Sequence, residues 1–313
     1  MTHSTLFSGL QGRLKEDAPL GARTWFRTGG NADWLFVPKN VDDLRSFLHQ
    51  RPSTMPLTVL GACSNIIIRD GGLEGAVIRL AGGFADITRD GDHGLIVGAA
   101  ALDVTVAEQA ALYGLAQMEF LVGIPGSIGG AIAMNAGAYG GEMRNILDWV
   151  DILTLDGQEK RLPAADLNMS YRHSSLPQGA IVIRARLRGT PDDPSLIKER
   201  LAHIRASREE SQPLRTRTGG STFRNPEEHK AWALIDQAGC RGLRFGDAQI
   251  SEKHCNFMLN TGQASSYELE HLGEIVKQRV LDNSGVMLQW EIKRLGRFLP
   301  NQHIAFSNTN MGA

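Results

Sequence analysis

Glycine spacing in one segment of this chain indicates close contact between the backbone and a ligand. Of the 35 glycines, the densest group includes Gly123, Gly126, Gly129 and Gly130, which have GxxGxxG spacing. Small residues let backbone N–H groups approach a pyrophosphate, and the dipole of a helix that begins there favours negative charge. The pattern therefore favours a phosphate-bearing ligand, with ordinary turns as the alternative.

A second segment, residues 61–65 (GACSN), lies between two apolar runs and likewise has small residues that would let the backbone approach a phosphate. Neither segment has the GxGxxG spacing of a dinucleotide-binding βαβ unit, and the chain has no Walker loop. These absences argue against a Rossmann-type NAD domain. No metal-ligand spacing such as HExxH occurs either, so we expect no metal.

Composition restricts the possible partners. The chain has 313 residues, enough for two domains, of which 42% are hydrophobic and 21% charged, as in an average globular protein. A formal charge of -1 provides no overall field that would attract nucleic acid or an anionic membrane. Anionic ligands must therefore be bound by local arginines and backbone amides.

The cysteines indicate a reducing compartment. Cys63, Cys240 and Cys255 are odd in number and lack CxxC spacing, which favours reduced thiols. A reactive thiolate at Cys255, beside His254, is the alternative to an inert apolar role. The sequence shows no signal-peptide core and no run of ~20 apolar residues. We therefore expect a cytoplasmic protein, with a monomer as the simplest state.

Short apolar runs alternate with helical patterns before residue 188. Helical periodicity predicts a helix at residues 41–49, with Asn40 as its N-cap, and another at 103–113. The segment 188–194 (RGTPDDP) interrupts both patterns and marks a boundary. The strands predicted from the apolar runs are residues 57–60, 65–68, 75–80, 95–98, 149–155 and 180–187.

The last hundred residues predict a compact α+β unit. A helix after the boundary has Ile197, Leu201 and Ile204 on one side, and residues 265–268 (SSYE) form a capping box that begins another helix. Residues 286–293 alternate between apolar and polar side chains, which predicts a strand with Glu291 on its polar face.

Eight segments in a fixed order carry a resemblance to a known family. They are residues 26–30 (FRTGG), 61–65 (GACSN), 70–72 (DGG), 123–139, 170–174 (SYRHS), 219–226 (GGSTFRNP), 234–239 (LIDQAG) and Glu291. Together they resemble the UDP-N-acetylenolpyruvoylglucosamine reductases from about residue 26 to about residue 295. The final domain is similar to that of the shorter form of the family.

The resemblance implies an α+β fold with a two-lobed FAD-binding region of the vanillyl-alcohol-oxidase/p-cresol-methylhydroxylase type and a smaller α+β substrate-binding domain. We place the FAD-binding region at residues 1–192, with lobes at about 1–80 and 81–192. The substrate-binding domain follows at 193–300, and residues 301–313 form a tail.

The implied activity is reduction of the enolpyruvyl group of UDP-N-acetylglucosamine enolpyruvate to UDP-N-acetylmuramate, a step in peptidoglycan precursor synthesis. FAD is the implied cofactor, NADPH the co-substrate and the UDP-sugar the partner. Two other interpretations compete with it: an oxidase of the same flavin fold that acts on an alcohol, and a non-catalytic nucleotide-binding module.

The resemblance also implies the residues that contact FAD. These are Gly61, Ala62, Cys63, Ser64, Asn65, Ile66, Gly123, Ile124, Pro125, Gly126, Ser127, Gly129, Gly130, Asn135 and Ile183. The family usually has glycines where this chain has Ala62 and Cys63. Their Cβ atoms would crowd a phosphate unless φ stays negative at both positions.

Three catalytic residues follow from the same match. Hydride addition to the double bond leaves negative charge at the substrate carboxylate and requires a proton at the neighbouring carbon. By this match, Arg172 binds the substrate carboxylate, Ser221 donates the proton and Glu291 has the remaining acid role. A guanidinium suits a carboxylate because it stays charged and donates two parallel hydrogen bonds. A solvated arginine, a turn serine and a solvated carboxylate are the alternatives.

Further polar residues are candidates for contacts with the substrate. Asn225 and Gln289 are candidate amides. Arg215, Arg217 and Arg224 are candidates for the UDP phosphates, and a solvated basic patch explains them almost as well.

Overall fold

The computed structural model describes residues 6–304, which divide into two compact units, each built from segments distant in the sequence. Unit 1 comprises residues 6–16, 34–62 and 75–208, and unit 2 comprises residues 17–33, 63–74 and 209–304. This division differs from the boundaries predicted from the sequence. Two segments before residue 75 belong to unit 2, and most of the helix after residue 193 belongs to unit 1.

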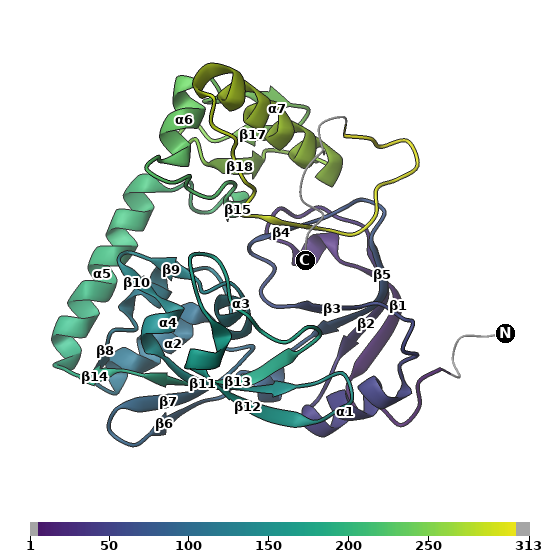
Figure 1. Ribbon diagram of the computed structural model, residues 1–313, viewed down its shortest axis with the longest axis vertical. Helices are drawn as coiled ribbons and strands as arrows, with labels where there is room; N and C mark the ends of the chain where they lie inside the picture. Colours follow the sequence, from purple (N-terminus) through teal and green to yellow (C-terminus); the bar gives the residue numbers. More distant parts are fainter. Residues whose placement is uncertain (1–5, 305–313) are drawn as a thin grey trace. The chain divides into compact units, whose positions relative to one another are not determined.

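One core of unit 1 joins a four-stranded sheet to helix α1 (Val41–Gln50). The strands, in sheet order, are β1 (Arg13–Pro19), β2 (Asn31–Val37), β5 (Leu73–Arg79) and β3 (Leu57–Leu60) (Figure 1). Leu44 and Phe47 of α1 pack with Phe36 and Ile78 of the sheet. The side chain of Asn40 accepts a hydrogen bond from a backbone N–H of the first turn, which confirms the predicted N-cap.

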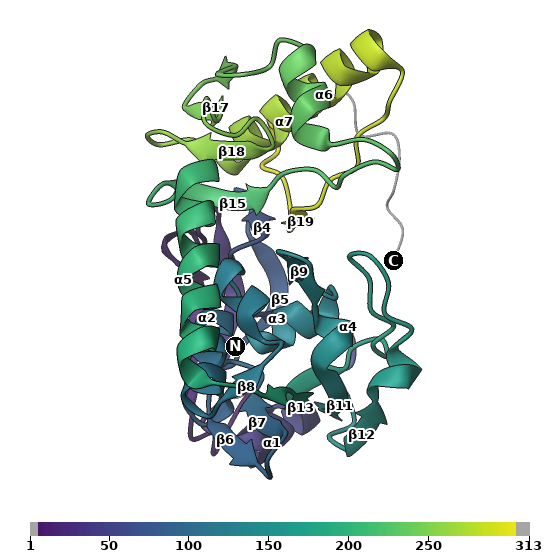
Figure 2. The ribbon, with the colours of Figure 1, turned by 90° about the vertical axis from the view of Figure 1, so that its left-hand side faces the viewer.

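The other core of unit 1 lies on a five-stranded sheet in which all neighbouring strands are antiparallel. Its strands, in sheet order, are β12 (Glu159–Pro163), β11 (Leu147–Leu153), β13 (Ile181–Arg188), β7 (Gly94–Gly98) and β6 (Ile87–Asp90). The helices of unit 1 beside it are α2 (Asp103–Leu112), α3 (Ile128–Ala133), α4 (Met143–Ile146) and α5 (Pro194–Ser211). Figure 2 shows α5 running beside α2. Ile197, Leu201 and Ile204 of α5 join the same core as Val106 and Ala110 of α2, which explains why α5 belongs largely to unit 1.

Two short strand pairs complete unit 1. They are β8 (Leu115–Ala116) with β14 (Thr190–Pro191), and β9 (Gly137–Ala138) with β10 (Gly141–Glu142). The β9–β10 pair is antiparallel and ends the glycine-rich segment. This segment is therefore closed by a hairpin of its own.

Unit 2 is a small α+β unit with one core. Its antiparallel sheet has the order β15 (Arg217–Ser221), β18 (Phe257–Asn260), β17 (Ala248–Ile250) and β16 (Arg244–Phe245). Helices α6 (Ala231–Gln237) and α7 (Ser266–Ser284) contribute side chains to the core. The capping box predicted at Ser265 is confirmed, since its side chain and that of Glu268 bond reciprocally to the backbone.

The strand predicted at residues 286–293 is wrong for most of its length. Only β19 (Lys293–Leu295) forms, in parallel with β4 (Ile66–Ile68). Leu288 and Ile292 are nevertheless buried, so the alternation of the sequence is real. A regular ladder is missing because the N–H groups of Glu291 and Ile292 both point to the carbonyl of Thr222. The other predicted strands and helices are confirmed, with ends that shift by one or two residues.

The predicted tail at 301–313 extends beyond the described residues, which end at 304. Its described part contacts unit 2: Gln302 Nε2 donates to Asp70 Oδ2 (2.9 Å), and the Tyr267 hydroxyl donates to the carbonyl of His303 (3.3 Å). Across residues 6–304, no helix has the length and apolar character needed to cross a bilayer.

Candidate active site

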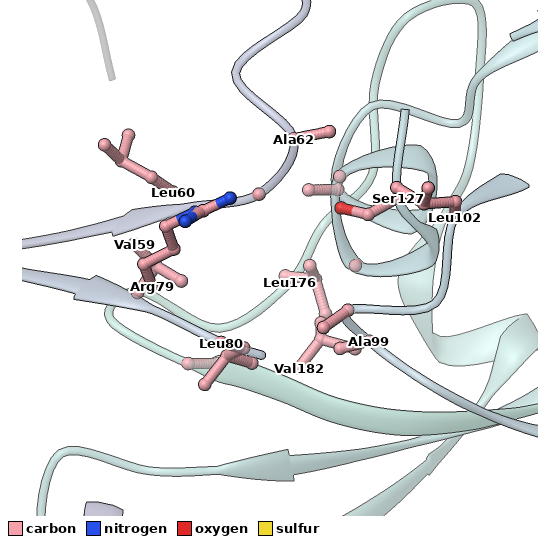
Figure 3. A pocket seen from close by; sticks show the side chains of 16 residues that line it. Val59, Leu60, Ala62, Arg79, Leu80, Ala99, Leu102, Ser127, Leu176 and Val182 are labelled. Atoms are coloured by element: carbon pink, nitrogen blue, oxygen red, sulfur yellow. The ribbon is translucent and has the colours of Figure 1, made fainter. Parts of the chain in front are cut away.

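A cavity in unit 1 brings the two predicted phosphate-binding segments together (Figure 3). Gly61 and Ala62, directly after β3, line it opposite Ser127, Gly129 and Gly130 at the beginning of α3. A Cβ atom added to Gly61 would lie 2.6 Å from Ser127 Oγ. The two segments therefore approach each other more closely than a larger residue at position 61 permits without a shift.

Strand ends form the remaining walls of this cavity. The lining residues that sequence reasoning missed are Val59, Leu60, Arg79, Leu80, Ala99, Ala100, Leu102, Ala133, Leu176, Ala180 and Val182. Arg79 is the last residue of β5 and supplies a positive charge to the lining. A cation at the end of an otherwise apolar strand was the available signal for it.

Ile183 is not among the lining residues. Its side chain lies in the core with Phe36, whereas the preceding Val182 lines the cavity. Successive side chains of a strand point to opposite faces, so β13 presents only one of the two to the cavity. The backbone of Ile183 does lie nearby, since its carbonyl accepts a hydrogen bond from Ala99 N (3.0 Å).

The loop after β3 turns sharply at Cys63, where φ is +56°. The condition that φ stay negative at the two substituted positions is therefore not met at Cys63, while Ala62 has no positive φ. This left-handed conformation normally favours glycine because it brings Cβ close to the backbone. The Cys63 side chain is buried within unit 2, so its Cβ atom is directed into the protein.

Two polar groups beneath the glycine-rich segment lack hydrogen-bond partners. Asp103, the first residue of α2, is fully buried, and neither carboxyl oxygen has a partner among the described residues. Burial raises the pKa of this carboxyl well above its ordinary value. The Ser127 hydroxyl is likewise buried and unpaired within residues 6–304. Because Ser127 lines the cavity, its hydroxyl can serve a ligand there.

Asn135 holds the glycine-rich segment to the turn that carries Arg172. Its Nδ2 donates to the carbonyl of Ser170 and to Glu142 Oε2, both at 2.9 Å. Its Oδ1 accepts from Arg144 N (2.9 Å). The side chain is buried and φ is +43°. Asn135 therefore uses its amide within the protein, which supports a positioning role more than direct contact with a flavin.

Arg172 lies in a tight turn in unit 1. The backbones of Ser170 and His173 exchange two hydrogen bonds of 3.1 and 3.0 Å around it. Arg172 has a φ of +55°, and its Nη1 donates to the carbonyl of Gly137 (3.3 Å). A non-glycine residue in this conformation is strained, and such residues gather at functional sites. The structure therefore places Arg172 beside the glycine-rich segment, and its contact with a substrate carboxylate stays a prediction.

Ser221 and Glu291 come together in unit 2. The Glu291 N–H donates to the carbonyl of Thr222 (2.8 Å), and Phe223 and Trp290 form an antiparallel bridge. The two candidate residues therefore lie on hydrogen-bonded segments. Both side chains are partly accessible.

An irregularity in β15 directs Ser221. The pairing of β15 with β18 shifts register between Thr218 and Ser221. Gly220 has a φ of +76°, and a Cβ atom on Gly219 would overlap the ring of Phe26. Such bulges re-aim side chains beside active sites. The glycine pair thus positions Ser221 and is not merely a turn.

Asn65 links the predicted cofactor loop to Glu291. Its Nδ2 donates to the Glu291 carbonyl (3.3 Å), and its own carbonyl accepts from Lys293 N (3.1 Å). These bonds extend the parallel pairing of β4 with β19 by one residue. The same backbone thus connects a candidate cofactor residue with a candidate acid.

The substrate candidates lie in different settings within unit 2. Arg224 N donates to the Gln289 carbonyl (2.9 Å), so these two residues adjoin the Ser221–Glu291 pair. The Asn225 side-chain oxygen accepts from Ala231 N (3.0 Å) and caps the beginning of α6. Arg215 is exposed, with a φ of +62°, beside the strand end occupied by Arg217.

The cysteines show no sign of a thiolate site. All three are free and buried, and burial raises the pKa of Cys255 to about 11. Cys255 is therefore a thiol at neutral pH, which supports the apolar role. Residues 6–304 contain no group of three or more metal-ligating side chains. The absence of a metal stays a prediction.

Known families match both halves of the chain. Residues 32–162 match the FAD binding domain, and residues 212–295 match the UDP-N-acetylenolpyruvoylglucosamine reductase, C-terminal domain. These matches and the solved structure below confirm the predicted fold class.

Similar proteins extend over nearly the whole chain. The UDP-N-acetylenolpyruvoylglucosamine reductase of Gluconobacter oxydans is 66% identical over 95% of this chain and 97% of its own length. That of Granulibacter bethesdensis is 57% identical over 95% of each. The crystal structure of the reductase from Thermus caldophilus has a TM-score of 0.80 at 35% identity, covering 91% of this chain and all of that one. This chain belongs to the UDP-N-acetylenolpyruvoylglucosamine reductase family.

Proposed function

We propose that this protein catalyses the NADPH-dependent, FAD-mediated reduction of UDP-N-acetylglucosamine enolpyruvate to UDP-N-acetylmuramate for peptidoglycan synthesis. The observation that carries the proposal is the hydrogen-bonded pairing of the Ser221 and Glu291 segments within unit 2. Relatives named for this reductase match the chain over nearly its full length. An alcohol oxidase has no comparable need for such a pair of proton donors.

The unit 1 cavity fits a dinucleotide phosphate. Gly61, Ala62, Ser127, Gly129 and Gly130 would form the FAD site there, with the unpaired Ser127 hydroxyl as a hydrogen-bonding group, whereas the Gly129 N–H already donates to the Ala99 carbonyl (2.8 Å). Arg79 would add a positive charge to this lining. On β13, we assign the contact with FAD to Val182 rather than to the Ile183 side chain. FAD bound there would supply the chemistry of hydride transfer from NADPH to the enolpyruvyl double bond.

The protein's own groups manage the charge that hydride addition creates. Arg172 binds the substrate carboxylate and stabilises the negative charge that develops there. Ser221 donates a proton to the adjacent carbon, and Glu291 is the remaining acid at that carbon. A hydroxyl with an ordinary high pKa can protonate so basic a carbon when it is held against it.

The remaining contacts and the setting complete the proposal. Asn225, Gln289, Arg215 and Arg224 contact the UDP-sugar. The three buried free thiols are consistent with a reducing, cytoplasmic location. A monomeric state stays a prediction.

A two-step anaerobic titration tests the function. NADPH alone should bleach the flavin absorbance of the purified holoenzyme. Addition of UDP-N-acetylglucosamine enolpyruvate should restore it with formation of one equivalent of UDP-N-acetylmuramate. Restoration only by O₂, or a protein that takes up no FAD, would contradict the proposal.

Gly130→Ala tests the location of FAD. An added Cβ atom meets no protein atom within 4 Å, so it projects into open space at the cavity lining. We expect FAD affinity to fall by about tenfold or more because the methyl group occupies ligand space. The free energy of unfolding of the apoprotein should rise by roughly 0.5–1 kcal/mol, since alanine is the better helix residue. Fluorescence titration and urea unfolding measure the two effects, and unchanged FAD affinity would move the cofactor elsewhere.

Ser221→Ala should separate the two half-reactions. Flavin reduction by NADPH should keep its rate, while reoxidation by the UDP-sugar should slow about 10²–10⁴-fold through loss of the proton donor. Anaerobic stopped-flow measurement of both steps decides this. Ser53→Ala, in an exposed serine, is the matched control. Equal slowing of both steps would remove Ser221 from the assigned role.

Arg172→Lys should weaken the second half-reaction by roughly 10–100-fold because one point charge replaces a bidentate contact. Reoxidation rates at increasing concentrations of the UDP-sugar report the effect. Arg188→Lys, an arginine whose side chain is 60% exposed, is the control. Wild-type kinetics in Arg172→Lys would show that the guanidinium does not hold the carboxylate.

A further inference from the structure

A buried carboxylate on α7 lies under the segment that carries Glu291. The side chain of Glu274 is 3% exposed. It accepts hydrogen bonds from Trp290 Nε1 (2.7 Å) and Arg294 Nη1 (3.3 Å), and one from Lys277 Nζ (2.9 Å). Two of these three donors lie on the 289–295 segment. Hydrogen bonds to an ionised acceptor are about twice as strong as neutral ones, so Glu274 anchors this segment to the helix.

The ring of Trp290 is fixed by contacts on several sides. Gly273 leaves room for it, because a Cβ atom there would overlap the indole. The ring of Phe223 lies 5.1 Å away at an angle of 51°, and the Arg294 guanidinium lies 4.7 Å above the indole. Trp290 is therefore held by packing and by one directed hydrogen bond from its N–H group.

This anchoring determines the position of the next residue. Glu291 directly follows Trp290, and its N–H and that of Ile292 both point to the Thr222 carbonyl, so the contacts that fix Trp290 against α7 limit where the Glu291 side chain can point. Residues 286–292 form no regular strand, and only the Phe223–Trp290 bridge and the bonds to Thr222 hold the pairing. The Trp290 anchor supplies the register that a ladder would otherwise supply.

We propose that Trp290 and Glu274 are positioning residues for the proton-transfer half of the reaction. Their hydrogen bond sets the register of the Glu291 segment against the Ser221 segment, and hence the separation of the two acids. This inference rests on the proposed function, in which Ser221 and Glu291 act together on the substrate.

A neighbouring ion pair provides a comparison within the same helix. Glu270 is also buried, with 1% of its side chain exposed, and it binds Arg69 through bonds of 2.8 and 3.1 Å. That pair connects α7 to the residue after β4. Glu270 Oε2 also lies 3.8 Å from Arg294 Nη1, so Glu270 shares one partner with Glu274, but within residues 6–304 the indole N–H of Trp290 donates to Glu274 and not to Glu270. If buried charge on α7 served only stability, changes at Glu270 and Glu274 would have the same functional effects.

Trp290→Phe tests the inference because it keeps a ring and removes the N–H donor. In anaerobic stopped-flow experiments on the holoenzyme, flavin reduction by NADPH should stay within about twofold of wild type. Reoxidation by UDP-N-acetylglucosamine enolpyruvate should slow about tenfold, the effect of losing one hydrogen bond to a charged group. The pH profile of reoxidation should also shift, since the environment of Glu291 changes. Trp232→Phe, at a tryptophan that is 46% exposed on α6, should leave both half-reactions and the pH profile unchanged.

Three further variants distinguish a positioning role from loss of stability. Glu274→Gln keeps an acceptor for the indole and should retain more reoxidation activity than Glu274→Ala. Glu270→Gln should lower the melting temperature without changing the ratio of the two half-reaction rates. Equal half-reaction ratios and pH profiles in wild type, Trp290→Phe and Glu274→Ala would overturn the inference. A wild-type enzyme that the UDP-sugar cannot reoxidise would instead overturn the proposed function, and the inference with it.

Discussion

The hydrogen bond from the Glu291 N–H to the Thr222 carbonyl, 2.8 Å long, is the constraint that fixes the Glu291 segment beside the Ser221 segment in unit 2. It joins two segments that are about seventy residues apart in the sequence. The Glu291 segment forms no regular strand before β19, and the ladder of the Ser221 segment shifts register before Ser221. The bulge before Ser221 and the link from Asn65 to the Glu291 carbonyl act on the same backbone. Because one residue of slippage would turn each side chain to the opposite face, a few directed bonds determine how the Ser221 and Glu291 side chains are oriented.

Backbone strain occurs at several of the candidate residues. Cys63, Asn135 and Arg172 all have positive φ, a conformation that costs free energy for residues other than glycine. Surrounding contacts maintain it: Asn135 bonds to Ser170 and Arg144, and the turn around Arg172 is closed by two backbone bonds. The strain serves to direct particular side chains, which regular strands and helices would point elsewhere. This explains why the candidate residues lie mostly in turns and at element ends.

The sequence predicted most elements because each has a local physical signal. The helix at Asn40 and the capping box at Ser265 satisfy unpaired N–H groups with nearby side chains, and a reader of the sequence can recognise both. The strand predicted around Glu291 was wrong because alternation of apolar and polar residues shows which side chains are buried, and not whether a hydrogen-bonded ladder forms. Arg79, Val182 and Asp103 were missed since their roles depend on strands and helices that meet only in the folded chain. The prediction named Ile183, whereas the adjacent Val182 lines the cavity. A difference of one position in a strand places the side chain on the opposite face.

Asp103 shows that unit 1 tolerates a cost to stability beneath the glycine-rich segment. Burial raises its pKa in the folded protein, so the folded state binds this proton more tightly than the unfolded chain does. Its contribution therefore favours folding at low pH and is lost as the pH rises above the ordinary value for a carboxyl. A Cβ atom on Gly126 would lie 2.5 Å from Asp103 Oδ2, so the acid lies directly against the segment. An ionised carboxylate there would repel a pyrophosphate, whereas the protonated acid does not. Burial disfavours ionisation of Asp103, so the same burial limits opposing negative charge beneath a lining in which the Ser127 hydroxyl and Arg79 can meet an anion.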